Sequence, residues 1–240
     1  MGTMPATIPG LAEYDAVHAM TNEPRSFKLF NAARGVTIRC GNLPHWFQPG
    51  ATYFITFRCA DSIPQALLRR WYGERSLWLR GHGIDPLDAN WRAQLRADPG
   101  VEDAYHGKFT RQIMQYLDQG HGRCELAQPR PARIVADSLL HFDRQRYHLA
   151  DFIIMPNHVH VLACLLGTVE IERQCRSWKA FSARQINGVL QRRGRFWQEE
   201  SFDHLVRSPL QFSRFQAYIA ENPIHAGLEP GQYLHRPLAM

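Results

Sequence analysis

The sequence lacks the features that mark membrane, secreted and disulfide-rich proteins. It has no run of about 18 apolar residues, so no segment is expected to span a membrane. The first residues show no basic leader followed by an apolar stretch, so no secretory signal is expected. The five cysteines form no Cys-x-x-Cys pair, and their odd number argues against a zinc ribbon or a disulfide framework. We therefore expect a cytoplasmic protein with reduced thiols.

The composition fits one folded domain with a basic surface. The chain has 240 residues, of which 45% are hydrophobic, and this is enough to bury a core as a single domain. The formal charge of +6 and the pI near 9.3 favour a polyanionic partner. A modest positive charge is also common in proteins that bind nothing acidic, so composition leaves the partner open.

Residue patterns along the chain predict an α+β fold. Alternating side chains predict strands over 51–59 and 147–155, and a further strand that begins at residue 158. Helices are expected over 64–80, 88–97, 109–119, 131–145, 169–190 and 208–222. Pro156 and Asn157 would turn one strand into the next as an antiparallel hairpin. Locally paired strands with helices between them indicate a central antiparallel β-sheet flanked by helices.

A His-Val-His triplet predicts a metal-binding strand. Strand geometry places His158 and His160 on one face and Val159 on the other. Two imidazoles suit Mn, Co, Ni or Zn, and with added oxygen ligands they also hold Mg, so the identity of the metal stays open. The alternative is a strand with two hydrogen-bonded or half-exposed histidines, which the triplet alone does not exclude.

A helix near the end of the chain brings a phenol and an amide together. Ser208 followed by Pro209 is the expected helix start, because serine caps a free amide and proline loses no bond at the first position. Pro223 disfavours helical geometry at Asn222, so the helix is expected to end there. Tyr218 and Asn222, four residues apart, then lie one turn apart on one face. A tyrosine near a helix end is also common in a core with its hydroxyl at the rim.

Four stretches, taken in order, resemble one protein family. They are ATYFITFR at 51–58, MPNHVH at 155–160, FWQEESFDH at 196–204 and YIAENPIHAGL at 218–228. Together they resemble the REP-associated tyrosine transposases, a branch of the HUH single-tyrosine transposases and a relative of the relaxase and replication-initiator nucleases. The resemblance covers residues 43–228. It leaves residues 1–42 as an N-terminal arm, loosely docked and without a counterpart, and residues 229–240 as a C-terminal tail.

The resemblance implies a fold, a chemistry and a substrate. The fold would be that of an HUH nuclease, with a ferredoxin-like or RRM-like core. A divalent metal, Mg or Mn, would be held by His158, His160 and Asn222. Tyr218 would be the nucleophile and form a 5′-phosphotyrosine intermediate. The substrate would be single-stranded or hairpin DNA of the repetitive extragenic palindrome type, handled by a monomer or homodimer associated with the nucleoid of a bacterial cell.

An arginine-rich segment is the candidate DNA contact. Three arginines stand beside two aromatic residues, so guanidinium groups could pair with phosphates while rings stack on unpaired bases. The candidate DNA-binding residues are Arg192, Arg193, Arg195 and Trp197. Trp197 could instead anchor the segment in the core. The arginines within 69–80 form a second basic strip, for which a solvated helix face is the simpler explanation.

Two other functions stay open at this point. A sequence-specific protein that binds repeat DNA without transposition would keep the same fold. A metal phosphohydrolase that uses water needs no tyrosine and usually more carboxylate ligands than this neighbourhood offers. Detection of a covalent protein–DNA adduct would separate the three functions.

Overall fold

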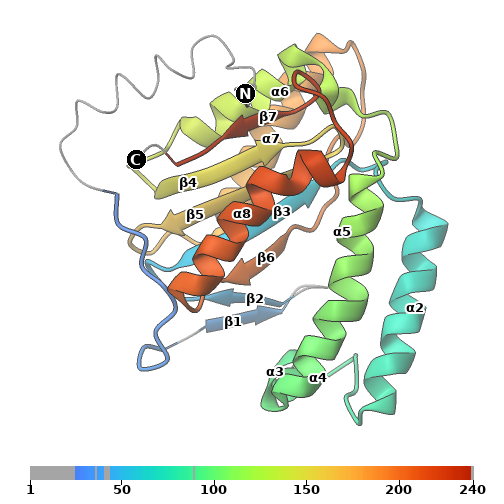
Figure 1. Ribbon diagram of the computed structural model, residues 1–240, viewed down its shortest axis with the longest axis vertical. Helices are drawn as coiled ribbons and strands as arrows, with labels where there is room; N and C mark the ends of the chain where they lie inside the picture. The colour runs from blue at the N-terminus through green and yellow to red at the C-terminus, as the bar shows by residue number, and fades with distance from the viewer. Residues whose placement is uncertain (1–24, 36, 41–43, 89, 239–240) are drawn as a thin grey trace.

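A five-stranded antiparallel sheet forms the centre of the computed structural model, which describes residues 25–35, 37–40, 44–88 and 90–238 (Figure 1). In spatial order the strands are β6 (Phe202–Leu205), β3 (Thr52–Arg58), β5 (His158–Leu165), β4 (Tyr147–Ile154) and β7 (Leu234–Arg236). A separate pair consists of β1 (Thr37–Cys40) and β2 (Pro44–Phe47). Because β5 is the middle strand, both of its edges are paired, and packed side chains cover both of its faces.

The helices lie on both faces and at one side of this sheet. They are α2 (Gln65–Gly81), α3 (Trp91–Ala97), α4 (Pro99–Tyr105), α5 (Arg111–Asp118), α6 (Pro129–Leu140), α7 (Ile171–Val189) and α8 (Pro209–His225). A π-helical segment, His106–Thr110, joins α4 to α5, and a short 3-10 turn, Glu125–Ala127, precedes α6. Helices α6 and α7 cover one face and α8 covers the other, while α2 to α5 stand beside the sheet (Figure 1).

The predicted α+β fold with a central antiparallel sheet is confirmed. The predicted hairpin forms from β4 and β5, and β3 pairs along the full length of β5. The short strands β6 and β7 were not predicted, because four or three residues are too few to show an alternating pattern. Residues after 228, expected as a tail, supply β7, which pairs with β4.

Helix α8 differs from the prediction at its end. Its start is as expected, since the Ser208 side chain accepts a hydrogen bond from the Gln211 amide at 3.2 Å. The prediction that the helix ends at Asn222 is wrong, because α8 continues through Pro223 to His225. The Ala226 amide still donates to the Asn222 carbonyl at 3.0 Å, so the last turn closes around the proline. Asn222 therefore keeps helical geometry, one turn after Tyr218.

Two buried cores lie on opposite faces of the sheet. The larger packs β3, β4 and β5 against α6 and α7, and the smaller packs the other face against α8. Part of the expected arm docks on the smaller core, where the Phe27 and Phe212 ring centroids lie 5.4 Å apart. The expected arm also supplies β1, and its residues 1–24, 36, 41 and 42 are outside the described residues. Within the described ranges no helix has both the length and the apolar character needed to cross a lipid bilayer.

Candidate functional site

The two histidines of β5 face α8 at the middle of the sheet. In the strand register Thr56 of β3 lies opposite His160, and Arg58 lies opposite His158. Both histidines are fully buried. The Phe54 ring stacks on the His160 ring at 5.3 Å and thereby closes one side of the site. The prediction that His158 and His160 share one face is confirmed, and that face is buried as deeply as the apolar one.

Hydrogen bonds fix which nitrogen of His158 carries the proton. The Asn157 amide nitrogen donates to the His121 carbonyl at 2.9 Å, so the Asn157 Oδ1 atom is the one that faces His158 Nδ1, at 2.7 Å. An amide oxygen only accepts, so Nδ1 of His158 must be protonated and Nε2 must carry the lone pair. The turn residue Asn157 thus orients a nitrogen suited to a metal ion.

The second histidine is held from the neighbouring strand. Its Nδ1 atom lies 2.7 Å from the Thr56 hydroxyl oxygen, and its Nε2 atom lies 3.1 Å from Nε2 of His158. If one Nε2 atom carries a proton and the other a lone pair, the two histidines form a hydrogen bond with each other. If both Nε2 atoms carry lone pairs, both can bind the same cation. The two Nε2 atoms are therefore close enough either to share one proton or to bind one cation.

Helix α8 places the predicted tyrosine against His160 and buries the predicted asparagine one turn further on. The Tyr218 and His160 ring centroids lie 5.2 Å apart in an edge-to-face contact, and Asn222 is fully buried one turn further on. The Tyr218 hydroxyl and both polar atoms of the Asn222 side chain have no hydrogen bond of ordinary geometry with the described residues. Buried polar atoms without partners are rare in folded proteins, and they concentrate where a ligand or substrate completes the bonding.

One acidic residue of the site was not predicted. Asp118, the last residue of α5, places its Oδ1 atom 3.8 Å from His158 Nε2. That oxygen is buried and makes no hydrogen bond of ordinary geometry with the described residues. A single carboxylate at a helix end shows no spacing pattern that links it to a motif far along the chain. Only the fold brings Asp118 to the histidines.

A tight loop holds the end of α5 against the sheet. Gly122 adopts a φ of +95°, and a Cβ atom there would lie 2.9 Å from the Asp61 backbone oxygen. The Arg123 amide donates to the Asp61 carboxylate at 3.0 Å. Asp61 follows β3, and the His121 carbonyl in the same loop accepts a hydrogen bond from Asn157, in the turn before β5. The loop therefore connects Asp118 to the end of β3 and to the start of β5.

Burial shifts the pKa of every titratable group in the site. It lowers the pKa of His158 from 6.5 to about 3, and it lowers the pKa of His160 well below 6.5, where His158 adds to the effect. It raises the pKa of Asp118 from 3.8 to about 6. Burial first, and the nearby Asp118 second, raise the pKa of Tyr218 above its usual value, while Asn222 acts in the opposite direction.

These shifts define the charge of the site at neutral pH. Both imidazoles are neutral, the Asp118 carboxyl is mostly ionised and the Tyr218 phenol is protonated. Neutral imidazoles are the form that binds metals, whereas a protonated buried phenol is a poor nucleophile. Positive charge supplied to the site would both satisfy the carboxylate and favour loss of the phenol proton.

The donor set fits a divalent ion only if the asparagine takes part. Among the described residues no three His, Cys, Asp or Glu side chains cluster closely enough to hold a metal by themselves. The amide oxygen of Asn222, outside those residue types, is buried and unpartnered. Two imidazole nitrogens and an amide oxygen form a mixed set that suits Mn and, with further oxygen ligands, Mg.

The arginine segment lies at the same end of the sheet as His158. Its backbone pairs with the end of β3, since the Gln198 amide donates to the Arg58 carbonyl at 2.8 Å. Arg192 forms an ion pair with Glu125 and also donates to the Arg195 carbonyl, so its guanidinium is engaged within the protein.

The remaining candidates of that segment differ in exposure. Arg193 is exposed and makes no ion pair with the described residues, and Arg195 is exposed beside Glu199 at 3.5 Å. Trp197 is buried at 4% exposure, and its indole nitrogen donates to the Ser182 hydroxyl at 2.9 Å. Trp197 therefore anchors the segment in the core and does not present a face for a base. DNA contact by Arg193 and Arg195 stays a prediction.

Comparisons with known proteins give one structural likeness. No protein-family model matches the chain, and no curated protein matches it. One solved structure, described as the REP-associated tyrosine transposase bound to a REP hairpin, is similar over 77% of this chain and 73% of its own. The two chains are 13% identical, and the TM-score is 0.38. A likeness at this level does not establish membership of a family.

Proposed function

We propose that this protein cleaves and rejoins single-stranded or hairpin DNA with the aid of a divalent metal ion. One observation carries the proposal. The Tyr218 ring of α8 lies edge-to-face against His160 of β5, and Asn222, one turn further along α8, is fully buried. The phenol and the Asn222 amide make no hydrogen bond of ordinary geometry with the described residues. A nucleophile beside a set of metal ligands is the arrangement that phosphoryl transfer requires.

The metal ligands would be His158, His160 and Asn222, and the ion would be Mg or Mn. When bound, such an ion neutralises charge on a phosphate and polarises phosphorus. Asn157 and Thr56 hold the two imidazoles in orientation through their Nδ1 atoms.

Tyr218 would perform the transfer itself. Its oxygen forms a bond to phosphorus as the bond from phosphorus to the 3′ oxygen breaks, and the phenol proton is balanced by protonation of the leaving 3′ oxygen. The product is a tyrosine linked to the 5′ phosphate beside a free 3′ hydroxyl. Because the phosphoester bond is exchanged and not hydrolysed, another 3′ hydroxyl can reverse the step and rejoin the strand without water or ATP.

The burial of the phenol has a consequence for specificity. A raised pKa keeps Tyr218 protonated until positive charge and a phosphate are both in place. In the free protein the protonated phenol would then not react with phosphates other than that of the bound substrate. Arg193 and Arg195, exposed at the same end of the sheet, would hold the DNA backbone near the site.

The covalent adduct provides the test. Labelled single-stranded and hairpin oligonucleotides copied from inverted repeats that flank the gene are incubated with Mn²⁺ or Mg²⁺ and resolved under denaturing conditions. Wild-type protein should form an adduct and Tyr218→Phe should form none, with stability nearly unchanged because the lost hydroxyl is unpartnered. Tyr233→Phe, on the same core, is the control and should react normally.

The outcomes separate the candidate functions. An adduct formed by Tyr218→Phe would refute the nucleophile. Tight DNA binding by the wild type without any adduct or cleavage would indicate the alternative, a repeat-DNA-binding protein without transposition activity. Metal-dependent cleavage without an adduct would indicate hydrolysis by water.

A further inference from the structure

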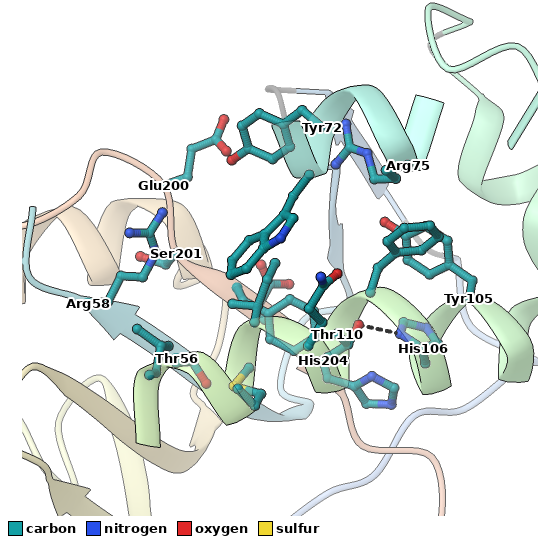
Figure 2. A pocket seen from close by; sticks show the side chains of 18 of the residues that line it. Thr56, Arg58, Tyr72, Arg75, Tyr105, His106, Thr110, Glu200, Ser201 and His204 are labelled. Carbon is teal, nitrogen blue, oxygen red and sulfur yellow. Dashed lines mark hydrogen bonds between the residues drawn. The ribbon is translucent and has the colours of Figure 1, made fainter. Parts of the chain in front are cut away.

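A partly enclosed cavity of about 150 Å³ lies between helices α2 to α5 and strand β6 (Figure 2). Figure 2 shows Tyr72 and Arg75 of α2 on one side of the cavity, Tyr105 of α4 on another, and Arg58 and Thr56 of β3 opposite them. The walls therefore come from elements that are far apart in the chain. The proposed transfer chemistry uses none of these aromatic groups.

The walls of this cavity are aromatic. Trp71, Tyr72 and Tyr105 all line it, and the Arg75 guanidinium lies over the Tyr72 ring at 5.0 Å. The Arg75 Nε atom is buried and has no hydrogen-bond partner among the described residues. Aromatic faces bind flat rings by stacking, and the polar side chains of the wall supply hydrogen-bonding groups for the edge of a ring.

The charges around the cavity balance and so argue against a phosphate ligand. Three arginines and three carboxylates line it: Arg58, Arg75, Arg207, Glu102, Glu200 and Asp203. One pair is direct, since Arg207 lies 3.4 Å from Glu102. A phosphate site needs surplus positive charge, whereas a neutral ring with both donors and acceptors suits a balanced wall.

The volume of the cavity matches about one ring. A protein cavity of about 150 Å³ is known to hold a single benzene-sized ring. A flat, neutral, hydrogen-bonding ring of that size is a pyrimidine base. A purine, with its second ring, would extend out of the cavity.

The cavity also adjoins the candidate metal site. Thr56 lines it and holds His160 Nδ1 at 2.7 Å, and Leu117 lines it and directly precedes Asp118. A base seated there would belong to a nucleotide close to the phosphate that Tyr218 attacks. Extrusion of one base from the strand would also fix the register of the DNA over the nucleophile.

We propose that this cavity binds one unpaired pyrimidine base of the DNA strand beside the cleaved phosphate. This inference rests on the proposed function, because that function supplies the DNA strand to which the base belongs. Helices α2 to α5 then act as a recognition element, while β5 and α8 carry the chemistry.

Photochemical crosslinking tests the proposal with the full-length protein. The probe is a pool of short single-stranded DNA of random sequence that carries one 5-iododeoxyuridine, and crosslinked residues are located by mass spectrometry. Crosslinks should fall on Trp71, Tyr72 or Tyr105. Crosslinks confined to other parts of the protein would overturn the proposal.

A second arm distinguishes a base in DNA from a free nucleoside. Free 5-iododeoxyuridine at the same concentration should label these residues far less than the DNA probe, because only the strand adds phosphate contacts. Equal labelling by the free nucleoside would overturn the assignment to DNA.

A matched pair of variants measures the contribution of the aromatic wall. Tyr72→Leu removes a ring that is 39% exposed, so folding should persist, and Phe181→Leu removes a ring of similar exposure, 44%, on α7. Affinity for single-stranded DNA should fall about tenfold in Tyr72→Leu, as expected for one lost stacking contact, and stay unchanged in Phe181→Leu. Equal affinity of the two variants would contradict the proposal.

An abasic nucleotide then tests whether the ring and the base interact. Scanning one abasic position along the oligonucleotide should locate a site where wild-type binding weakens, and at that site Tyr72→Leu should show no further loss. Full additivity of the two losses would contradict the base pocket. Failure of the proposed function would look different, because the wild type would then form no tyrosine adduct even if the crosslinks appear.

Discussion

The two faces of strand β5 are equally buried but differ in how their atoms are satisfied. The face towards α6 and α7 carries Val159, Val161 and Ala163 in a largely apolar core, in which the buried Trp197 indole is hydrogen-bonded to Ser182. The face towards α8 carries His158 and His160, beside polar atoms that have no partner within the described residues. Burial alone therefore does not distinguish the two faces. The polar side chains gathered between β5, α5 and α8 do.

The difference has an energetic meaning. A buried polar group without a partner costs about 1–3 kcal/mol relative to one that is bonded. The α8 face holds several such groups, contributed by Asp118, Tyr218 and Asn222. A site that lowers stability in the free protein gains the missing bonds when ion and substrate bind, so ligand binding should stabilise the fold. The following predictions test this comparison of the two faces.

The largest effect is expected for removal of both histidines. His158→Ala combined with His160→Ala should abolish cleavage, because loss of the ion removes several kcal/mol of transition-state stabilisation, on the order of 1,000-fold in rate or more. The rise in melting temperature on addition of Mn²⁺, measured by thermal unfolding, should disappear as well. A variant that keeps this rise would show that the ion binds elsewhere.

A truncation on the apolar face should lower stability but leave the response to Mn²⁺ intact. Ile55 of β3 is fully buried opposite Val161, and Ile55→Ala should lower the free energy of unfolding by about 2–5 kcal/mol in urea titrations. The Mn²⁺-induced rise in melting temperature should remain. Ile55→Val is the conservative control, with an expected loss of about 0.5–1.5 kcal/mol. Loss of the metal response in Ile55→Ala would show that the two faces are coupled.

Acid should weaken the fold through the histidine face. The pKa of His158 is about 3 in the folded protein and 6.5 when unperturbed, so the unfolded chain binds the extra proton between those values. Stability should therefore fall as the pH drops from 6.5, by at most about 1.4 kcal/mol per pH unit for each buried histidine. Urea titrations over this range measure the slope.

Asp118 should oppose that loss. Its pKa is raised from 3.8 to about 6 by burial, so the folded form binds the extra proton in that window and is favoured as the pH falls. In Asp118→Asn the loss of stability between pH 6 and 4 should be steeper than in the wild type. An unchanged slope would mean that the carboxyl is more solvated than its position suggests.

The smallest effect concerns the arginine segment. Arg193→Ala with Arg195→Ala should reduce the slope of log affinity against log salt by up to about 0.7 per lost contact on single-stranded DNA. Arg192→Ala breaks the ion pair with Glu125 and should lower stability while leaving the slope unchanged. Both are read from binding titrations at several salt concentrations. An unaltered slope in the double variant would place the DNA elsewhere.

The sequence was sufficient for the parts of the site that depend on local geometry. Strand alternation placed His158 and His160 on one face, and helical spacing placed Tyr218 and Asn222 on another, because both periods are short and regular. Asp118 and the aromatic cavity could not be predicted, since they arise where α2 to α5 return to the sheet. Such contacts depend on tertiary packing, which leaves no period in the chain.

Trp197 illustrates a different limit. A tryptophan in an arginine-rich segment fits both a stacking platform and a core anchor, because composition does not reveal which way the ring points. The hydrogen bond from its indole to Ser182, at 2.9 Å, shows that it is a core anchor. The predicted end of α8 at Asn222 was wrong for a related reason. The local preference of a residue before proline against helical geometry was weaker than the contacts that α8 makes with the sheet.

The order of the elements along the chain has a consequence for biosynthesis. Helix α8 and strand β7 follow all other described parts of the sheet, so they leave the ribosome after them. Until they do, the histidine face of β5 is uncovered and the outer edge of β4 is unpaired. Tyr218 and Asn222 can therefore meet His158 and His160 only after α8 has been synthesised. If the proposed function holds, a nascent chain that still lacks α8 would carry no assembled site for cleavage.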